Sequence, residues 1–155
     1  MSTATITITA VPWTHPHAGR LRDLMDEELG ARYADLRALR GPRVPVEPAS
    51  VLVTFVAYDG ERPVATAALR RAHGFYEVKR VFVAASHRRV GLAARLLGAL
   101  GDRASAAGVR TLVLQTGTRQ PEAVALYERE GWQAAPAFGE YVGDELSLCF
   151  AKELS

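Results

Sequence analysis

The sequence predicts an α/β fold, with a mixed sheet that carries helices on both faces, and two observations lead to this prediction. Three consecutive segments at 51–58, 64–71 and 75–83 are rich in strand-forming residues and are separated by short turns. The chain beyond them alternates between apolar stripes at helical spacing and short apolar runs. Short turns join antiparallel strands, whereas intervening helices allow parallel neighbours, so both kinds of pairing are expected.

Length and composition fit a single domain over residues 1–155. The chain is 48% hydrophobic and 23% charged, which is too apolar for a disordered protein. No run approaches the roughly 20 apolar residues that a membrane helix needs, and the first residues lack the pattern of a secretory signal. Cys149 is the one cysteine, so an internal disulfide is excluded and a cytoplasmic location is expected.

The charge balance argues against nucleic acid as a partner. The net charge is +2, and all of the 19 cationic side chains except Lys79 and Lys152 are arginine. Nucleic-acid binding needs clustered cations with interleaved aromatic residues, and the sequence does not show that pattern. Arginine also suits phosphate and carboxylate groups, so local clusters carry more information than the total.

The N-terminal third predicts one strand and two helices. Residues 5–11 alternate between apolar and polar side chains, as in a strand, and Pro12 ends the pattern. Pro16 is a favourable first helical residue, and apolar side chains follow it at helical spacing, at Leu21, Leu24, Met25 and Leu29. A second short helix is expected at about 31–39, ended by Gly41-Pro42 and followed by a loop that is rich in proline.

The remaining elements follow from turn residues and apolar spacing. The three strands of the β-rich block are expected to turn at Asp59-Gly60 and His73-Gly74. A long helix is then predicted, with Gly108 as its C-terminal stop and an apolar stripe made by Leu92, Leu96, Leu97, Leu100 and Ala104. The last three elements are expected to be a strand at 111–115, a helix at about 122–130 and a strand at 146–151.

The segment from Glu77 to Ala93 joins a strand, a loop and the start of the long helix. A helix N-terminus offers unpaired amide hydrogens and a partial positive charge, which suit a phosphate. Gly91 lets a ligand approach the backbone closely, and Arg88 and Arg89 add positive charge, so a pyrophosphate is the predicted ligand. The segment lacks the signatures of a Walker loop or a dinucleotide-binding turn. The alternative is a solvated loop whose glycine only eases the chain into the helix.

The same segment resembles the signature of the GNAT superfamily of acyl-CoA-dependent N-acyltransferases. In that family a strand leads into a [QR]-x-x-G-x-[GA] loop, which Arg88, Gly91 and Ala93 match. Downstream, Q-P-E-A-V-A-L-Y-E and the following Gly131-Trp132 are similar to the family's N-x-x-A-x-x-L-Y-E helix and its G-[FWY]. The order of elements agrees over nearly the whole chain, and the strand E-V-K-R-V-F-V resembles that of a branch of small bacterial members.

The resemblance implies a mostly antiparallel sheet that is splayed beside strand 75–83, with acetyl-CoA as co-substrate and no metal. Pantetheine would insert at the splayed strand, whose backbone would bind its amides and the thioester oxygen, and an amide hydrogen there would stabilise an oxyanion. Gln120 stands where the family often has asparagine. The binding residues that the resemblance implies are Val81, Phe82, Val83, Arg88, Arg89, Val90, Gly91, Leu92, Ala93 and Gln120.

Two residues match the family's acid–base positions. Glu77 lies four residues before Val81, where some members carry a general base, and would take a proton from the amine directly or through water. Strand periodicity places Glu77 on the same side as Val81 and Val83 unless a bulge intervenes. Tyr127 matches a tyrosine that can protonate the leaving thiolate. The alternatives are a structural carboxylate paired with Lys79 or Arg80, and aromatic packing by Tyr127.

The resemblance places the acceptor pocket at the first helices and the last loop, and the substrate-binding residues expected are Glu28, Tyr33, Arg80 and Tyr141. Two charged clusters suggest different substrates. A carboxylate-rich rim would attract a cationic amine, and consists of Glu27, Glu28, Glu140, Asp144 and Glu145. A basic patch would either receive a substrate carboxylate or form a solvated sheet face, and consists of Arg70, Arg71, Lys79 and Arg80.

Ordinary structural roles are expected for four other residues. His15 and His17 lack a carboxylate or thiol at metal-ligand spacing, so no metal is expected there. His87 is expected to be an exposed loop residue, although it lies near the predicted phosphate site. Cys149 is expected to be a small buried apolar residue of the last strand.

The sequence thus predicts an acetyl-CoA-dependent N-acetyltransferase that acetylates a primary amine of a small molecule by direct attack. One alternative keeps this chemistry with a protein or peptide amine as acceptor. The other is a binding module that senses acetyl-CoA without turnover. No membrane partner is expected, and whether the chain forms a homodimer is left open.

Overall fold

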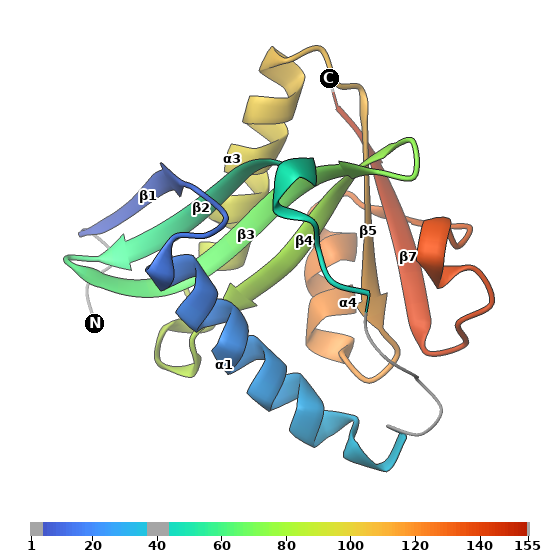
Figure 1. The fold of residues 1–155 in the computed structure, drawn as a ribbon, viewed down its shortest axis with the longest axis horizontal. Helices are drawn as coiled ribbons and strands as arrows, with labels where there is room; N and C mark the ends of the chain where they lie inside the picture. The colour runs from blue at the N-terminus through green and yellow to red at the C-terminus, as the bar shows by residue number, and fades with distance from the viewer. Residues whose placement is uncertain (1–4, 37–43, 155) are drawn as a thin grey trace.

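The computed structural model describes residues 5–36 and 44–154, which form one seven-stranded sheet with helices on both of its faces (Figure 1). The strand order is β1-β2-β3-β4-β5-β7-β6, and every neighbouring pair is antiparallel except β4 and β5. The predicted α/β class with a mixed, mostly antiparallel sheet is therefore confirmed. The elements are β1 (Ile6–Val11), α1 (Pro16–Arg32), β2 (Val51–Asp59), β3 (Arg62–Ala72), β4 (Phe75–Val83), α3 (Leu92–Ala106), β5 (Thr111–Gly117), α4 (Pro121–Arg129), β6 (Gln133–Ala135) and β7 (Ser147–Glu153).

The prediction of a second N-terminal helix at 31–39 is wrong in its described part. Helix α1 continues without a break to Arg32, and a single 3₁₀ turn, Ala34–Leu36, follows it. The expected end at Gly41-Pro42 lies outside the described residues. The β2–β3 turn falls at 60–61 rather than 59–60, because Asp59 still pairs with Arg62.

The helices pack against opposite faces of the sheet because successive strand residues point to opposite sides. Phe55 and Ala57 of β2 belong to the main core cluster, which includes the apolar stripe of α3. Val56 lies between them and instead packs with Ala18 and Leu21 of α1. Among the described residues, no helix is both long and apolar enough to cross a bilayer.

Strand β4 carries a β-bulge in its second half, which changes the face to which its side chains point. Lys79 pairs with Ala68 of β3, but the next pair joins Phe82 to Thr66, so β4 contains one residue more than β3 between these pairs. Arg80, within the bulge, has a φ of 60°, a conformation that side-chain-bearing residues rarely adopt.

The bulge overturns the expectation that Glu77, Val81 and Val83 share one side of the strand. Val81 and Val83 pack against the main core cluster together with Val78, on the α3 side. Glu77 is bonded to Tyr141 instead, and lies on the opposite face. The extra residue reverses the alternation, as a one-residue slip in a strand does.

Strands β4 and β5 separate almost as soon as they meet. Their parallel pairing consists of two residue pairs, Glu77 with Val113 and Val78 with Leu114. Beyond Val78, β4 remains paired with β3 but no longer with β5. Figure 1 shows the two strands diverging, with α4 beside the gap and α1 crossing in front of it. The splay that the resemblance implied is present.

Candidate active site

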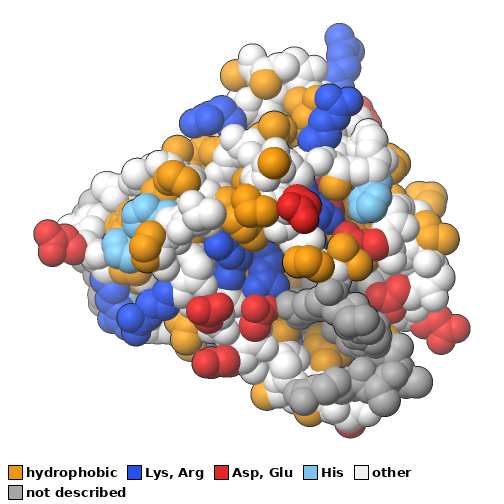
Figure 2. All heavy atoms as spheres, viewed as in Figure 1, with side chains coloured by type: hydrophobic (Ala, Val, Ile, Leu, Met, Phe, Trp, Pro, Cys, Tyr) orange, Lys and Arg blue, Asp and Glu red, His pale blue; other side chains and the backbone are white. Residues whose placement is uncertain are grey.

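A cavity of about 860 Å³ opens at the splay, between α1, α4 and the diverging strands. Its walls combine backbone and side chains of β4 and β5 with residues of α1, α4 and the loop before β7. Seen from the same side as the ribbon, Figure 2 shows cationic side chains near the middle of this face with carboxylates next to them. Its polar and aromatic lining includes Trp13, Arg22, Asp23, Asp26, Tyr33, Lys79, Arg80, Gln115, Thr116, Gln120, Tyr127, Glu140, Tyr141, Asp144 and Ser147.

The start of α3 has the features of an open anion-binding site. Gly91 is the N-cap residue, with a φ of 82° and no side-chain hydrogen bond to the helix. Arg88, Arg89 and Val90 before it are exposed, and a Cβ on Gly91 would meet no atom within 4 Å. The first amide hydrogens of α3 therefore lie beside open space.

Several predicted binding residues offer only their backbone to a ligand. The side chain of Phe82 packs with α1, and that of Leu92 is 2% exposed in the main core. Arg88 donates from Nε to the carbonyl oxygen of Val83 and from Nη2 to Glu28, at 3.0 and 2.6 Å. Glu28 thus pairs with the loop rather than lining the cavity.

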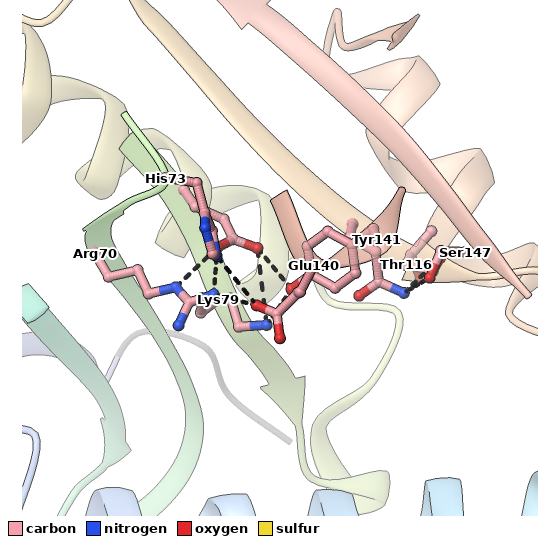
Figure 3. Close-up of polar contacts among 9 residues, drawn as sticks. Arg70, His73, Lys79, Thr116, Glu140, Tyr141 and Ser147 are labelled. Carbon is pink, nitrogen blue, oxygen red and sulfur yellow. Dashed lines mark hydrogen bonds and ion pairs between the residues drawn. The ribbon is translucent and has the colours of Figure 1, made fainter. Parts of the chain in front are cut away.

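Glu77 is completely buried at the root of the splay, where both of its oxygens accept hydrogen bonds. Figure 3 shows Arg70, Lys79 and Tyr141, which contact this carboxylate, close together. Arg70 donates from Nε to Oε1 at 2.8 Å, and the Tyr141 hydroxyl donates to Oε2 at 2.9 Å. Lys79 lies 3.7 Å from Oε2 and donates to the Tyr141 hydroxyl at 2.6 Å. Arg70 also pairs with Glu140 at 2.8 Å, so one buried guanidinium bridges two carboxylates.

The electrostatics of this network follow from burial and from neighbouring charges. Burial alone would lower the pKa of Arg70, but Glu77 and Glu140 raise it above its usual value. Burial lowers the pKa of Lys79 against the opposing influence of Glu77. Burial, followed by the charge of Glu77, raises the pKa of Tyr141, so its hydroxyl remains protonated and able to donate.

Tyr127 of α4 lines the same cavity and also packs in the core. Its ring lies 6.1 Å from that of Trp132 and 6.0 Å from that of Phe150, between centroids. Burial raises the pKa of its hydroxyl well above the usual value. A protonated tyrosine is a hydrogen-bond donor at neutral pH, so Tyr127 can pack its ring in the core and still donate a hydrogen bond from its hydroxyl.

Tyr33 and Gln120 meet over a glycine at the end of β5. The Gln120 side-chain oxygen accepts from the amide of Gly117 at 3.0 Å and from the Tyr33 hydroxyl at 3.5 Å. The Tyr33 hydroxyl accepts in turn from the amide of Arg119 at 3.0 Å. A Cβ on Gly117 would lie 1.9 Å from the Tyr33 hydroxyl, so this junction of α1, β5 and α4 requires glycine.

The expectation that the basic patch forms a solvated sheet face is wrong for three of its four members. Arg70 is 4% exposed, and the side chains of Lys79 and Arg80 are 18% and 15% exposed. Arg80 donates from Nη2 to the carbonyl oxygen of Arg22 and to Asp26, at 3.0 and 2.6 Å. Arg71 is the exposed member, with its guanidinium over the ring of Tyr76.

Sequence reasoning missed Arg22, which lies in the cavity wall. Its guanidinium stacks 3.6 Å from the ring centre of Trp13 and donates to the Trp13 carbonyl oxygen. The available signal was its four-residue spacing from Asp26, which places both on one side of a helix.

The prediction that His87 is exposed is wrong, because it is 4% exposed. Its Nε2 bonds Asp59 at 2.9 Å and its Nδ1 bonds Ser86 at 2.7 Å, which fixes the loop to the end of β2. Cys149 is buried as predicted, and burial raises the pKa of its thiol. Among the described residues no group of three or more His, Cys, Asp or Glu side chains is arranged to hold a metal.

The structure thus combines a splayed sheet with a long helix whose N-terminus is open, and comparison with known proteins gives the family. The model of the acetyltransferase (GNAT) family matches residues 18–132, so the chain belongs to this family. A Klebsiella pneumoniae protein classed among the acyl-CoA N-acyltransferases has a similar structure, with a TM-score of 0.79, 31% identity and coverage of 98% of this chain and 99% of that one.

Two further relatives bear on the site. A GNAT acetyltransferase from Elizabethkingia anophelis, solved with acetyl-CoA bound, shares the fold at a TM-score of 0.69 and 18% identity, over 97% of this chain and 99% of that one. The IAA acetyltransferase of Azospirillum brasilense is 42% identical over 81 residues, which is 52% of this chain. The matched part spans about half of that relative, or 53% of its length.

The junction at Gly117 gives a prediction for stability. Gly117→Ala forces Tyr33 and Gln120 apart, and we expect it to lower the free energy of unfolding by about 1–3 kcal/mol, as overpacking does. The measurement is denaturant unfolding of both proteins. Gly98→Ala is the matched control, because a Cβ there meets no atom within 4 Å in the middle of α3. That change should raise stability by about 0.5–1 kcal/mol, and an equal response from both variants would contradict the interpretation.

Proposed function

We propose that this chain is an acetyl-CoA-dependent N-acetyltransferase that transfers the acetyl group to a primary amine of a small molecule by direct attack. The observation that carries the proposal is the splay of β4 from β5, which opens into the 860 Å³ cavity, and the chain leads from β4 to the uncapped start of α3. A cavity of this volume, walled by α1 and α4, suits a small acceptor better than a folded protein surface.

The chain's residues fit acetyl-CoA in two places. The amides from Arg89 to Ala93, with the exposed Arg89 side chain, suit the pyrophosphate. The edge of β4 beyond Val78, which has no β5 partner, suits the extended pantetheine, through backbone groups of Val81 and Val83. The acetyl-CoA bound by the Elizabethkingia anophelis relative supports this assignment. The thioester would supply the acetyl group, and its sulfur would leave as a thiol.

The proposed route for the amine's proton runs through Tyr141 to Glu77. Glu77 is fully buried, whereas Tyr141 lines the cavity and donates to Glu77 Oε2. A substrate ammonium bonded to the Tyr141 oxygen would pass it one proton while Tyr141 passes its own to Glu77. The amine becomes neutral, Tyr141 is unchanged and Glu77 becomes protonated.

The proposed donor to the leaving thiolate is Tyr127. It lines the cavity on α4, and its burial keeps the hydroxyl protonated and able to donate to the departing sulfur. The carbon–sulfur bond breaks with its electron pair on sulfur, and the phenolic proton moves to that sulfur. The resulting phenolate then regains a proton from solvent.

The first test measures binding of acetyl-CoA by titration calorimetry, followed by thiol release with a panel of amines. We expect binding and turnover of small amines, and Gly91→Ala should weaken acetyl-CoA binding about tenfold or more because its φ of 82° disfavours a side chain. Gly108→Ala is the matched control, since Gly108 has a φ of 83° just beyond the other end of α3. Binding without turnover would indicate a sensor or a protein acceptor, and no binding would refute the proposal.

The proton route predicts similar kinetic defects for Glu77→Gln and Tyr141→Phe. Each change breaks the relay, so kcat should fall by about 10²–10⁴-fold while the dissociation constant for acetyl-CoA is preserved. The measurement is the pH profile of kcat for both variants, with thermal unfolding to verify the fold. A normal rate in Tyr141→Phe with a slow Glu77→Gln would show that Glu77 acts by another path.

Tyr127→Phe tests the acid role separately from packing. The ring contacts with Trp132 and Phe150 are kept, so the melting temperature should hardly change. Loss of the hydroxyl should slow acetyl transfer by about 10²-fold or more. A normal rate combined with a lower melting temperature would show that Tyr127 contributes to packing and not to proton donation.

A further inference from the structure

The cavity combines two charged walls whose contacts differ. On the α1 side lie Arg22 and Arg80 together with Asp23 and Asp26, and on the side of the loop before β7 lie Glu140 and Asp144. Both walls face one cavity, so two residues of the carboxylate-rich rim, Glu140 and Asp144, and two of the basic patch, Lys79 and Arg80, are parts of one site. A single ligand can contact both.

The cationic side chains around the cavity differ in how closely carboxylates of the protein are paired with them. Arg70 is held by Glu77 and Glu140, and Lys79 donates to Tyr141 and lies 3.7 Å from Glu77. These two belong to the buried network at the base of the splay. Arg22 and Arg80 are the other cations of the described cavity wall, and of these Arg80 pairs with Asp26 through Nη2.

Arg22 contains a buried donor that the protein leaves unsatisfied. Its Nη1 is buried and has no hydrogen-bond partner within the part of the chain that the structure describes. The guanidinium is held rigidly by stacking on Trp13 and by the bond from Nη2 to the Trp13 carbonyl oxygen. Buried polar groups are normally paired, so an unpaired one in a cavity wall points to an anionic ligand.

Arg80 reinforces this site from the β4 bulge. Its strained backbone, at a φ of 60°, accompanies a side chain that crosses to α1. The two contacts to α1 use Nη2 alone, although a guanidinium has five N–H donors. Burial and the neighbouring charge of Arg80 lower the pKa of Arg22, against Asp23 and Asp26. A bound anion would relieve this repulsion.

The opposite wall suits a cation. Glu140 and Asp144 line the cavity there, and Tyr141 between them is the residue to which we assigned the amine's proton. An ammonium near Tyr141 therefore lies beside these two carboxylates, next to Lys79, which donates to the Tyr141 hydroxyl.

We infer that the acceptor is an amino acid or a similar zwitterion, with its carboxylate bound by Arg22 and Arg80 and its ammonium directed to Tyr141. The inference rests on the proposed function and adds the substrate class. A diamine would bring a second positive charge to the arginines, and a simple amine would leave the Arg22 donor unpaired. A zwitterion places its carboxylate at the two arginines and its ammonium at Tyr141, so each of its charges meets groups of the opposite sign.

The test compares matched compounds that differ in the carboxylate alone. Each set contains an amino acid, its carboxamide and the amine left after decarboxylation, such as leucine, leucinamide and isopentylamine, and the sets include α- and ω-amino acids. Calorimetry with protein saturated in coenzyme A measures binding without turnover, and thiol release with acetyl-CoA measures kcat/KM. In at least one set the amino acid should bind about 10- to 100-fold more tightly than its partners, because charge-assisted hydrogen bonds are lost from them.

Variants connect this preference to the two arginines. Arg80→Gln and Arg22→Gln should each raise KM for the amino acid about 10- to 100-fold and leave that for the decarboxylated amine within about twofold. Arg62→Gln, on an exposed residue of β3, is the control and should change neither. Thermal unfolding verifies the fold, and Arg80→Gln keeps the test decisive if Arg22→Gln does not fold.

The outcomes separate this inference from the proposed function. If acetyl-CoA binds and amines are acetylated, but carboxamides or simple amines react as well as amino acids in every set, the zwitterion assignment is wrong and the acetyltransferase stands. Equal losses for all acceptors in Arg80→Gln would also overturn it. If amino acids bind the coenzyme A complex selectively but no acceptor is acetylated, the site is upheld and the proposed activity fails.

Discussion

The bulge at Arg80 is the constraint on which the centre of this molecule depends. One additional residue in β4 reverses its alternation, turns Val81 and Val83 toward the α3 side and brings Arg80 to α1. The pairing of β4 with β5 ends at Val78, just before the bulge, and from there on β4 is paired with β3 alone. An unpaired edge inside a protein must be satisfied by something, and an extended ligand is the natural partner. The bulge thus lies at the point where the strands part, and it shapes the wall of the cavity.

The buried network at the root of the splay holds the diverging segments together. Glu77 of β4 is joined to Arg70 of β3 and to Tyr141 before β7, so three separate elements meet at one carboxylate. Removing one partner of a buried ion pair typically costs about 3–5 kcal/mol, because the other charge stays buried and unpaired. Stability and the proposed proton transfer therefore depend on the same residues. This dual dependence explains why Arg70 would be a poor choice for testing the chemistry alone.

Much of the fold could be predicted, because it depends on local patterns. Turn residues and apolar spacing gave strand 75–83 with both of its ends correct, and Gly108 follows the end of α3 with the expected positive φ. The three-residue β6 and the uninterrupted α1 were missed, because a strand so short has no periodicity and the 3₁₀ turn that follows α1 resembles a helix in sequence.

The site could be predicted only where a motif or a short spacing carried it. The loop before α3 was identified from Arg88, Gly91 and Ala93, which lie within six residues. The bond between Tyr141 and Glu77 joins residues 64 positions apart, and no spacing rule reaches that far. His87 was misplaced because its partner, Asp59 at the end of β2, lies 28 positions away in the sequence. Arg22 was overlooked because its role depends on Trp13 and on the bulge, which are both tertiary features.

Helix α1 forms one wall of the cavity, and exposed ion pairs join its second half to the rest of the protein. Its buried residues are Ala18 and Leu21, whereas Asp26 pairs with Arg80, Glu28 with Arg88 and Arg32 with Glu122. Each of these pairs has a partner that is well exposed to solvent, and salt screens such charges over about 8–10 Å. Ionic strength therefore acts on this wall much more than on the α3 side, whose helix is held by its leucine stripe. The width of the acceptor cavity becomes a property of the solution as well as of the fold.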